Sequence, residues 1–302
     1  MTKNLKYFFS AFLISLAFFG GLNFLQKNLE GYLLAEISFP VENLAPVKIP
    51  ETVQKPELDI DAVSALSLQI SKKEENILFQ KNAKLPLPIA SITKLMTALI
   101  VFDNPDIYNP SYAIIVSKTA ADQGNTQNFG NLKAGDEYTV EELLNLMLIY
   151  SSNDAAFALS EVMGADEFVA EMNQKALSLG QTHTKFINPT GLDTSGTDLN
   201  FSSASDLSKL AKYILENQPA IFEITAKGHE NKSVENGLFD LVLEPGQNFV
   251  GGKTGFTQKA SGCILYIFQD ANKNIYINVI LRTKTEESRI SEMQNLINWI
   301  NL

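Results

Sequence analysis

The sequence is poor in the residue types that build most zinc sites and catalytic triads. Among its 302 residues there is one cysteine, Cys263, and there are two histidines, His183 and His229. A single cysteine excludes an intrachain disulfide, and zinc sites and Ser–His–Asp triads depend on Cys or His. We therefore expect neither a metal nor a cofactor, and we expect any hydrolytic chemistry to use serine, lysine or carboxylate groups.

Positive charge is scarce as well. The chain has 24 Lys and Arg against 34 Asp and Glu, which gives a net charge of −10. Because binding of phosphates needs clustered Lys and Arg, this balance predicts that nucleic acid is not a partner. It leaves room for local positive charge inside a cleft. A chain of this length and composition can bury a substantial globular core.

An uncharged apolar run lies near the N-terminus. Residues 7–26 contain no charged side chain, and Lys3 and Lys6 precede them. A helix of about 20 apolar residues matches a bilayer core, and the lysines favour a cytoplasmic N-terminus. Residues 1–30 are therefore predicted to anchor the chain in the cytoplasmic membrane by a single pass, with the remainder on the external, periplasmic or cell-wall side. A cleaved signal peptide followed by secretion is the alternative.

Residues 31–60 are predicted to form an extended linker, because prolines recur in them without a helical period: Pro40, Pro46, Pro50 and Pro56. We predict that one domain follows, over residues 61–302. Its two ends carry strand patterns. These patterns cover residues 64–70, 77–80, 249–255, 263–269 and 275–281.

The middle of the domain, roughly residues 117–217, has helical patterns instead. Thr139 and Glu142 form a capping-box pattern, and glycines at 164 and 180 are typical of residues that follow helix ends. Another helix is predicted over residues 203–217, and further helices are predicted before this region at 91–102 and at the C-terminus. Strands at both ends with helices between them indicate one sheet built from both ends of the domain, plus an inserted helical lobe.

Three short motifs carry the candidate chemistry. Ser91 and Lys94 are three residues apart on a predicted helix, where such residues face the same side. A neutral lysine there can take the proton of the serine without a histidine. Ser151-Ser152-Asn153 lies between two predicted helices, and Lys253-Thr254-Gly255 follows a glycine pair on a predicted strand, where glycines allow another backbone to approach closely.

Each motif alone has a structural explanation: a surface pair, helix caps or a strand-edge lysine. Together they occur once each and in one order. The surrounding segments are PIASITKLMTALIV, LKAGDEYTVEELLNLMLIYSSNDAA, FINPTGLD, GGKTGFT and SGCILY. With these segments, Ala62 to Leu302 resembles the serine D-alanyl-D-alanine carboxypeptidases, which are low-molecular-mass penicillin-binding proteins of peptidase family S11. The resemblance implies an α+β fold of the β-lactamase/D,D-peptidase type, with an antiparallel sheet flanked by helices.

The resemblance also implies roles for individual residues. Ser91 is expected to be the nucleophile, Lys94 its base, and Ser151 a proton relay to the departing amine. The other residues are expected to bind substrate: Asn153 its peptide backbone, Lys253 and Thr254 beside Gly255 its terminal carboxylate, the N–H groups of Ser91 and Phe256 the oxyanion, and Arg289 the carboxylate. A surface arginine is the alternative for Arg289.

The implied activity is trimming of peptidoglycan stem peptides that end in D-Ala-D-Ala, through an acyl-enzyme that β-lactams also form. A D,D-endopeptidase acting on cross-links uses the same site and stays open. A β-lactamase of class A needs a deacylating glutamate, and the loop at residues 188–200 offers Asp193 and Asp198 but no glutamate. A non-catalytic peptidoglycan-binding or sensor protein is disfavoured because all the motif residues are present.

Overall fold

The computed structural model divides the chain into two units, Met1–Gln54 and Lys55–Leu302, and the fold is that of the second unit. The residues described are 21, 22, 24, 26, 29, 55–72, 74–124, 130–194, 196–227 and 237–302. Apart from the isolated positions, the predicted membrane segment and the predicted linker up to residue 54 lie outside the described residues. Within the described residues, no helix is both long and apolar enough to cross a bilayer. The predicted domain start at residue 61 stays a prediction.

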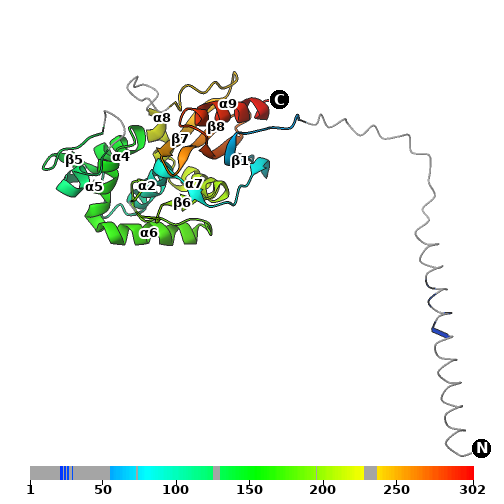
Figure 1. Cartoon of the computed structure of the whole chain (residues 1–302), viewed down its shortest axis with the longest axis horizontal. Helices are drawn as coiled ribbons and strands as arrows, with labels where there is room; N and C mark the ends of the chain where they lie inside the picture. Colours follow the sequence, from blue (N-terminus) through cyan, green and yellow to red (C-terminus); the bar gives the residue numbers. More distant parts are fainter. Residues whose placement is uncertain are drawn as a thin grey trace, which may run out of the picture. The chain divides into compact units, whose positions relative to one another are not determined.

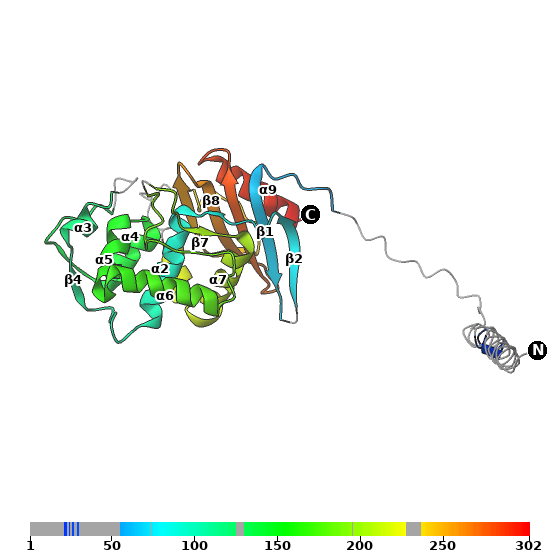
Figure 2. The ribbon, with the colours of Figure 1, turned by 60° about the horizontal axis from the view of Figure 1, so that its bottom comes forward.

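One five-stranded antiparallel sheet forms the centre of the domain. Its strands are β1 (Ala62–Ile70), β2 (Glu75–Lys81), β7 (Asn248–Thr257), β8 (Ser261–Gln269) and β9 (Ile275–Thr283). The strand order is β2-β1-β9-β8-β7, so the pairing of β1 with β9 joins the two ends of the domain. Figure 2 shows these strands side by side. The prediction of a sheet built from both ends is confirmed, and β7 lies at one of its edges.

Helices fill the middle of the chain (Figure 1). They are η1 (Ala90–Ile92), α2 (Thr93–Asp103), α3 (Lys118–Ala121), α4 (Val140–Ile149), α5 (Asn153–Met163), α6 (Ala165–Ser178), α7 (Ala204–Asn217), α8 (Ala220–Lys227) and α9 (Ser288–Ile300). The predicted capping box of Thr139 and Glu142 opens α4, and Gly164 ends α5 as expected.

Sequence patterns did not predict α8 or two small sheets. One small sheet pairs β3 (Leu87–Pro88) with β6 (Phe201–Ser202), and the other pairs β4 (Ala113–Ile115) with β5 (Glu137–Thr139). Strands of two or three residues are too short to show a period of two, so only the tertiary contacts define them.

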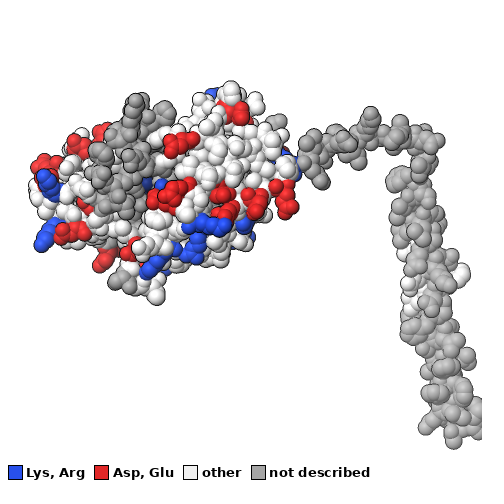
Figure 3. All heavy atoms as spheres, turned by 45° about the horizontal axis from the view of Figure 1, so that its top comes forward, with Lys and Arg blue, Asp and Glu red and all other residues white. Residues whose placement is uncertain are grey.

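The surface carries charges of both signs. On the face drawn in Figure 3, Lys and Arg side chains lie next to Asp and Glu side chains. Ion pairs in the described part of the chain include Lys212 with Glu75 and Lys284 with Asp61. Solvent screens exposed pairs of this kind, so each contributes little to stability.

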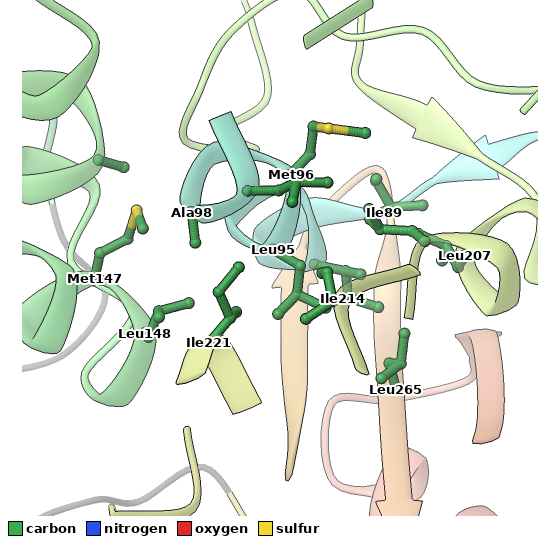
Figure 4. Packing of buried hydrophobic residues seen from close by; sticks show 14 of the residues in the cluster. Ile89, Leu95, Met96, Ala98, Met147, Leu148, Leu207, Ile214, Ile221 and Leu265 are labelled. Carbon is green, nitrogen blue, oxygen red and sulfur yellow. The ribbon is translucent and has the colours of Figure 1, made fainter. Parts of the chain in front are cut away.

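Two hydrophobic clusters lie on the opposite faces of the sheet. Alternate residues of β8 belong to different clusters: Leu265 joins the larger cluster with the helices, whereas Ile264 joins the cluster under α9. Residues 93–101 of α2 are all buried, and Figure 4 shows Leu95 of this helix among apolar side chains of several other elements. Truncating such a side chain to alanine costs about 2–5 kcal/mol. The rigid core around α2 therefore fixes the residues at its start.

Candidate active site

Ser91 lies in the tight turn η1 that opens α2. Ala90, directly before it, has a backbone φ of 47°, which residues other than glycine rarely adopt. Two glycines pack against the peptide that joins these residues. A Cβ atom added at Gly191 would lie 2.0 Å from the carbonyl oxygen of Ala90, and one added at Gly255 would lie 3.0 Å from the nitrogen of Ser91. Close backbone contacts on both sides thus hold the candidate nucleophile.

Lys94 lies one helical turn further on and is fully buried. Its Nζ atom lies 2.9 Å from Ser91 Oγ. It also donates hydrogen bonds of 2.7 Å to Asn153 Oδ1 and 2.6 Å to the carbonyl oxygen of Thr190. None of these partners is acidic. Burial, followed by the charge of nearby Lys253, holds the pKa of Lys94 well below its ordinary value. The arrangement therefore favours a neutral amine beside a serine hydroxyl.

A second buried lysine enters the site from β7. Lys253 Nζ donates to Ser151 Oγ over 2.9 Å and lies 3.3 Å from the carbonyl oxygen of Thr254. Burial, followed by the charge of Arg289, lowers the pKa of Lys253 to about 7. This side chain is therefore easily charged by a nearby anion.

Arg289 lies beneath the same strand. Its guanidinium donates to the carbonyl oxygen of Gly255 over 3.2 Å and pairs with Glu286 over 3.0 Å. The side chain is 7% exposed, so the alternative of a surface arginine is wrong. Its predicted contact with a substrate carboxylate stays a prediction.

The Ser-Ser-Asn segment serves both the fold and the site. Ser152 caps α5 by accepting a hydrogen bond from the N–H of Ala155 over 3.1 Å. Asn153 uses both ends of its amide: Oδ1 accepts from Lys94, and Nδ2 donates to the carbonyl oxygen of Gly124 over 2.6 Å. The predicted contact of Asn153 with the substrate backbone stays a prediction, but the side chain already orients the lysine.

The structure brings the three motifs together where β7 contacts η1. Ser91 and Asn153 contact the amine of Lys94, and Ser151 contacts the amine of Lys253. The remaining predicted site residues lie on or under β7: Lys253, Thr254, Gly255, Phe256 and Arg289. Figures 1 and 2 show α2 and β7 next to each other. The arrangement places a serine hydroxyl, a buried amine with a lowered pKa and a second lysine in one site, and groups of these types can carry out acyl transfer.

Two features differ from what the sequence predicted. The glycine pair at 251 and 252 was expected to let another backbone approach closely. A Cβ atom at Gly252 would lie 2.5 Å from the carbonyl oxygen of Leu265 on β8, but one at Gly251 would meet the side chain of Phe222 of α8 at 2.6 Å. This glycine therefore makes room for a helix of the protein itself. The contact of Lys94 with the carbonyl oxygen of Thr190 was not predicted, because a backbone acceptor leaves no mark in side-chain patterns.

Comparisons with known proteins give matches within one family. The family model of peptidase S11, described as D-alanyl-D-alanine carboxypeptidase, matches residues 50–285. The carboxypeptidase DacF of Bacillus subtilis is 33% identical over 256 residues, which are 80% of this chain and 63% of DacF. The D-alanyl-D-alanine endopeptidase of Escherichia coli is 27% identical over 278 residues, or 89% of this chain and 86% of that protein.

Solved structures show the same architecture. Penicillin-binding protein D2 of Listeria monocytogenes, in its ampicillin-bound form, superposes with a TM-score of 0.63 at 27% identity. The match covers 81% of this chain and 99% of that one. The predicted fold class is therefore confirmed. Against DacF, the chain spans less than two thirds of the relative's length.

Proposed function

Because the chain belongs to the D-alanyl-D-alanine carboxypeptidase family, peptidase S11, we propose that it is a serine-type carboxypeptidase that removes the terminal D-alanine from peptidoglycan stem peptides. One observation carries the proposal. The fully buried amine of Lys94 lies 2.9 Å from Ser91 Oγ and has no acidic partner among its three described contacts.

The hydrogen-bond partners of Lys94 support its role as the base. A neutral amine has two N–H groups and one lone pair. Asn153 Oδ1 and the carbonyl oxygen of Thr190 can only accept, so they take the two N–H groups. The lone pair is left for the O–H of Ser91, which transfers its proton to Lys94 as Oγ attacks the carbonyl of the penultimate D-alanine.

The later steps follow from the same groups. The N–H groups of Ser91 and Phe256 stabilise the negative oxygen of the tetrahedral intermediate. Collapse of the intermediate breaks the peptide C–N bond. The departing amine takes, through Ser151, the proton that Lys94 accepted from Ser91, which returns Lys94 to its neutral form. Lys253 holds Ser151 at 2.9 Å. Water then cleaves the ester and releases Ser91. A β-lactam acylates the same oxygen and is expected to inhibit the enzyme covalently.

Recognition of the terminal D-alanine rests on positive charge. Lys253 and Thr254 are buried on β7, and Arg289 lies under the same strand. A substrate carboxylate beside Lys253 favours its charged form and raises its pKa above the value of the free enzyme. This chemistry explains how an acidic protein binds an anionic peptide end.

Labelled penicillin and a D-Ala-D-Ala peptide test the proposal. We expect one covalent adduct on Ser91, none in Ser91→Ala, and release of free D-alanine by the unmodified chain. Lys94→Ala and Lys253→Ala are expected to fold normally and to lose acylation. Absence of any adduct on the intact, folded protein would refute the enzymatic proposal and favour a binding or sensor role.

A D,D-endopeptidase is the second candidate, because one relative with that name matches over most of its length. Mass analysis of cross-linked and linear muropeptides after digestion separates the two activities. A β-lactamase is less well supported. The loop at residues 188–200 offers aspartates but no glutamate, and both oxygens of Asp193 accept hydrogen bonds from Thr257 and Lys259.

We further propose that residues 1–30 anchor the chain in the cytoplasmic membrane with its domain outside. The uncharged run at 7–26 and the preceding Lys3 and Lys6 support this proposal. The intact chain is expected in the membrane fraction, and a chain lacking residues 1–30 is expected to leave it. An N-terminus mapped beyond residue 30 in the mature protein would replace the anchor with a cleaved signal peptide.

A further inference from the structure

The loop at residues 188–200 is tied to the turn between β7 and β8 in both directions. Asp193 Oδ1 accepts a hydrogen bond from Thr257 Oγ1 over 2.8 Å, and Oδ2 accepts from the N–H of Lys259 over 3.1 Å. In return, Lys259 Nζ donates to the carbonyl oxygens of Thr194 and Gly196 over 3.1 and 2.6 Å. Four contacts thus fix the distance between the loop and the turn.

Each tied segment carries a part of the active site. On the loop, Thr190 binds the amine of Lys94, and Gly191 packs against the backbone of Ser91. On the strand, Phe256 directly precedes Thr257 and is expected to supply an oxyanion N–H. Asp193 therefore connects the group that orients the base with the group that receives the developing negative charge.

Other hydrogen bonds of the loop join its own residues to one another. Asn188 Oδ1 accepts from the N–H groups of Thr190 and Gly191 over 3.2 and 2.7 Å, and Asn200 donates to the carbonyl oxygen of Asn188 over 2.9 Å. These bonds give the loop its form but do not reach β7. The side chain of Asp193, by contrast, extends from the loop and accepts hydrogen bonds from Thr257 at the end of β7 and from Lys259 in the turn after it.

We propose that Asp193 is a positioning residue for acylation: it holds the Lys94-binding loop and the oxyanion end of β7 in register, without touching substrate. The inference rests on the proposed function. It requires a carboxylate, because two donors approach two separate oxygens, and asparagine offers only one accepting oxygen. Small misplacements of reacting groups cost about 100-fold in rate, so loss of this tie is expected to slow chemistry.

The test compares Asp193→Ala and Asp193→Asn with Asp198→Ala. Asp198 lies in the same loop, carries the same charge and is exposed, so it is the matched control. Acylation by a labelled β-lactam is followed over a range of concentrations, which separates the non-covalent dissociation constant from the acylation rate constant.

We expect Asp193→Ala to lower the rate constant about 100-fold and to leave the dissociation constant within about threefold, because Lys253 and Thr254 are untouched. Asp193→Asn keeps one bond and is expected to recover about tenfold of that loss. Asp198→Ala is expected to match the wild type. Thr257→Val keeps the side-chain shape but removes the donor to Asp193 and the acceptor of the Ala260 N–H. Thr257→Ser keeps both hydrogen bonds and is the control for it. Thr257→Val is expected to lose about tenfold relative to Thr257→Ser and serves if Asp193→Ala fails to fold.

Three results would overturn the inference. One is acylation of folded Asp193→Ala, or of Thr257→Val, within twofold of the wild-type rate. Another is a dissociation constant that rises about 100-fold while the acylation rate constant stays unchanged, which would make Asp193 a binding residue. The third is normal acylation with slowed release of the adduct, which would place Asp193 on the deacylating water. A wild-type chain that does not acylate would instead refute the proposed function on which the inference rests.

Discussion

Lysines in the cleft and lysines on the surface have opposite surroundings. Lys94 and Lys253 are buried, and their described hydrogen bonds go to hydroxyl, amide and carbonyl oxygens. Burial lowers the pKa of both. On the surface, Lys212 pairs with Glu75 and Lys284 with Asp61. Hydrogen bonds to these carboxylates raise the pKa of both surface lysines.

The difference shows what the fold does for catalysis. An amine near an acid in solvent stays charged and has no lone pair to offer. An amine that is buried among oxygen atoms without negative charge loses its proton more easily. In the proposed mechanism, Lys94 acts as the base because none of its described hydrogen-bond partners is an acid. Most of the variants below alter one of these two lysine environments.

The largest effect is expected from placing an acid in the cleft. Asn153→Asp keeps the side-chain shape and puts a carboxylate where an amide oxygen now lies 2.7 Å from Lys94 Nζ. An opposite charge at this distance raises the pKa of the amine by several units, so most molecules lose the neutral base. Acylation by labelled penicillin at neutral pH is expected to fall about 1,000-fold.

Asn217→Asp is the matched control for this change. Asn217 ends α7 on the surface, so the same substitution there adds the same charge far from the motif residues. It is expected to leave acylation unchanged. Wild-type acylation by Asn153→Asp would show that Lys94 does not act as a neutral base.

The next largest effect concerns the backbone contact beside Ser91. Gly191 has a φ of 85°, and a Cβ atom there would strike the carbonyl of Ala90. Gly191→Ala is expected to cost roughly 2–4 kcal/mol in the free energy of unfolding. Gly196→Ala, in the same loop, would meet nothing closer than 3.9 Å and is expected to be nearly neutral. Equal urea unfolding midpoints for the two variants would show that the close contact between Gly191 and Ala90 does not restrict residue 191.

The pH dependence is expected to be smaller but diagnostic. Lys253 must be charged to bind a carboxylate, and its pKa is about 7 in the free enzyme. Because the charged form disappears as the pH rises through this value, kcat/KM for D-alanine release is expected to fall about tenfold per pH unit above it. In kcat the decline moves to higher pH, because bound substrate stabilises the ammonium group.

Lys253→Arg sharpens this prediction, since a guanidinium stays charged throughout the range. The variant is expected to have a lower kcat/KM but no alkaline decline. A wild-type profile that stays flat from about pH 6 to 9 would contradict the role of Lys253 as a titrating cation.

The smallest effect is expected on the surface. Lys212 pairs with Glu75, and both side chains are partly exposed. Because solvent screens the pair, Lys212→Ala is expected to lower the free energy of unfolding by less than about 1 kcal/mol and to leave acylation unchanged. A decrease of more than about 2 kcal/mol in the free energy of unfolding, measured with urea, would show that this surface ion pair contributes more to stability than solvent screening permits.

The sequence predicted the elements that have a regular period or a cap. The strands at both ends, the capping box at Thr139 and the helix end at Gly164 all follow from local physics. The approach of Ser91 to Lys94 follows from helical spacing. The meeting of the three motifs was predicted from their order and from the family resemblance, and the structure brings them together.

Other features of the site depend on contacts between distant segments. The left-handed backbone conformation of Ala90 involves a single residue, so no sequence pattern indicates it. Helix α8 was not predicted because its short apolar stretch shows no clear periodicity. The tie of Asp193 to Thr257 joins residues 64 positions apart, and only the tertiary fold defines such a pair. In sequence, Asp193 could be noted only as a carboxylate in a loop.

The charge of Lys94 in the free enzyme is the quantity on which the mechanism depends most directly. It can be followed by ¹³C NMR of lysine labelled at Cε, with the signal assigned by its loss in Lys94→Arg. We expect a titration midpoint well below the ordinary lysine value of about 10.4, and a neutral amine at neutral pH. A midpoint near the ordinary value in the folded, acylation-competent protein would contradict it.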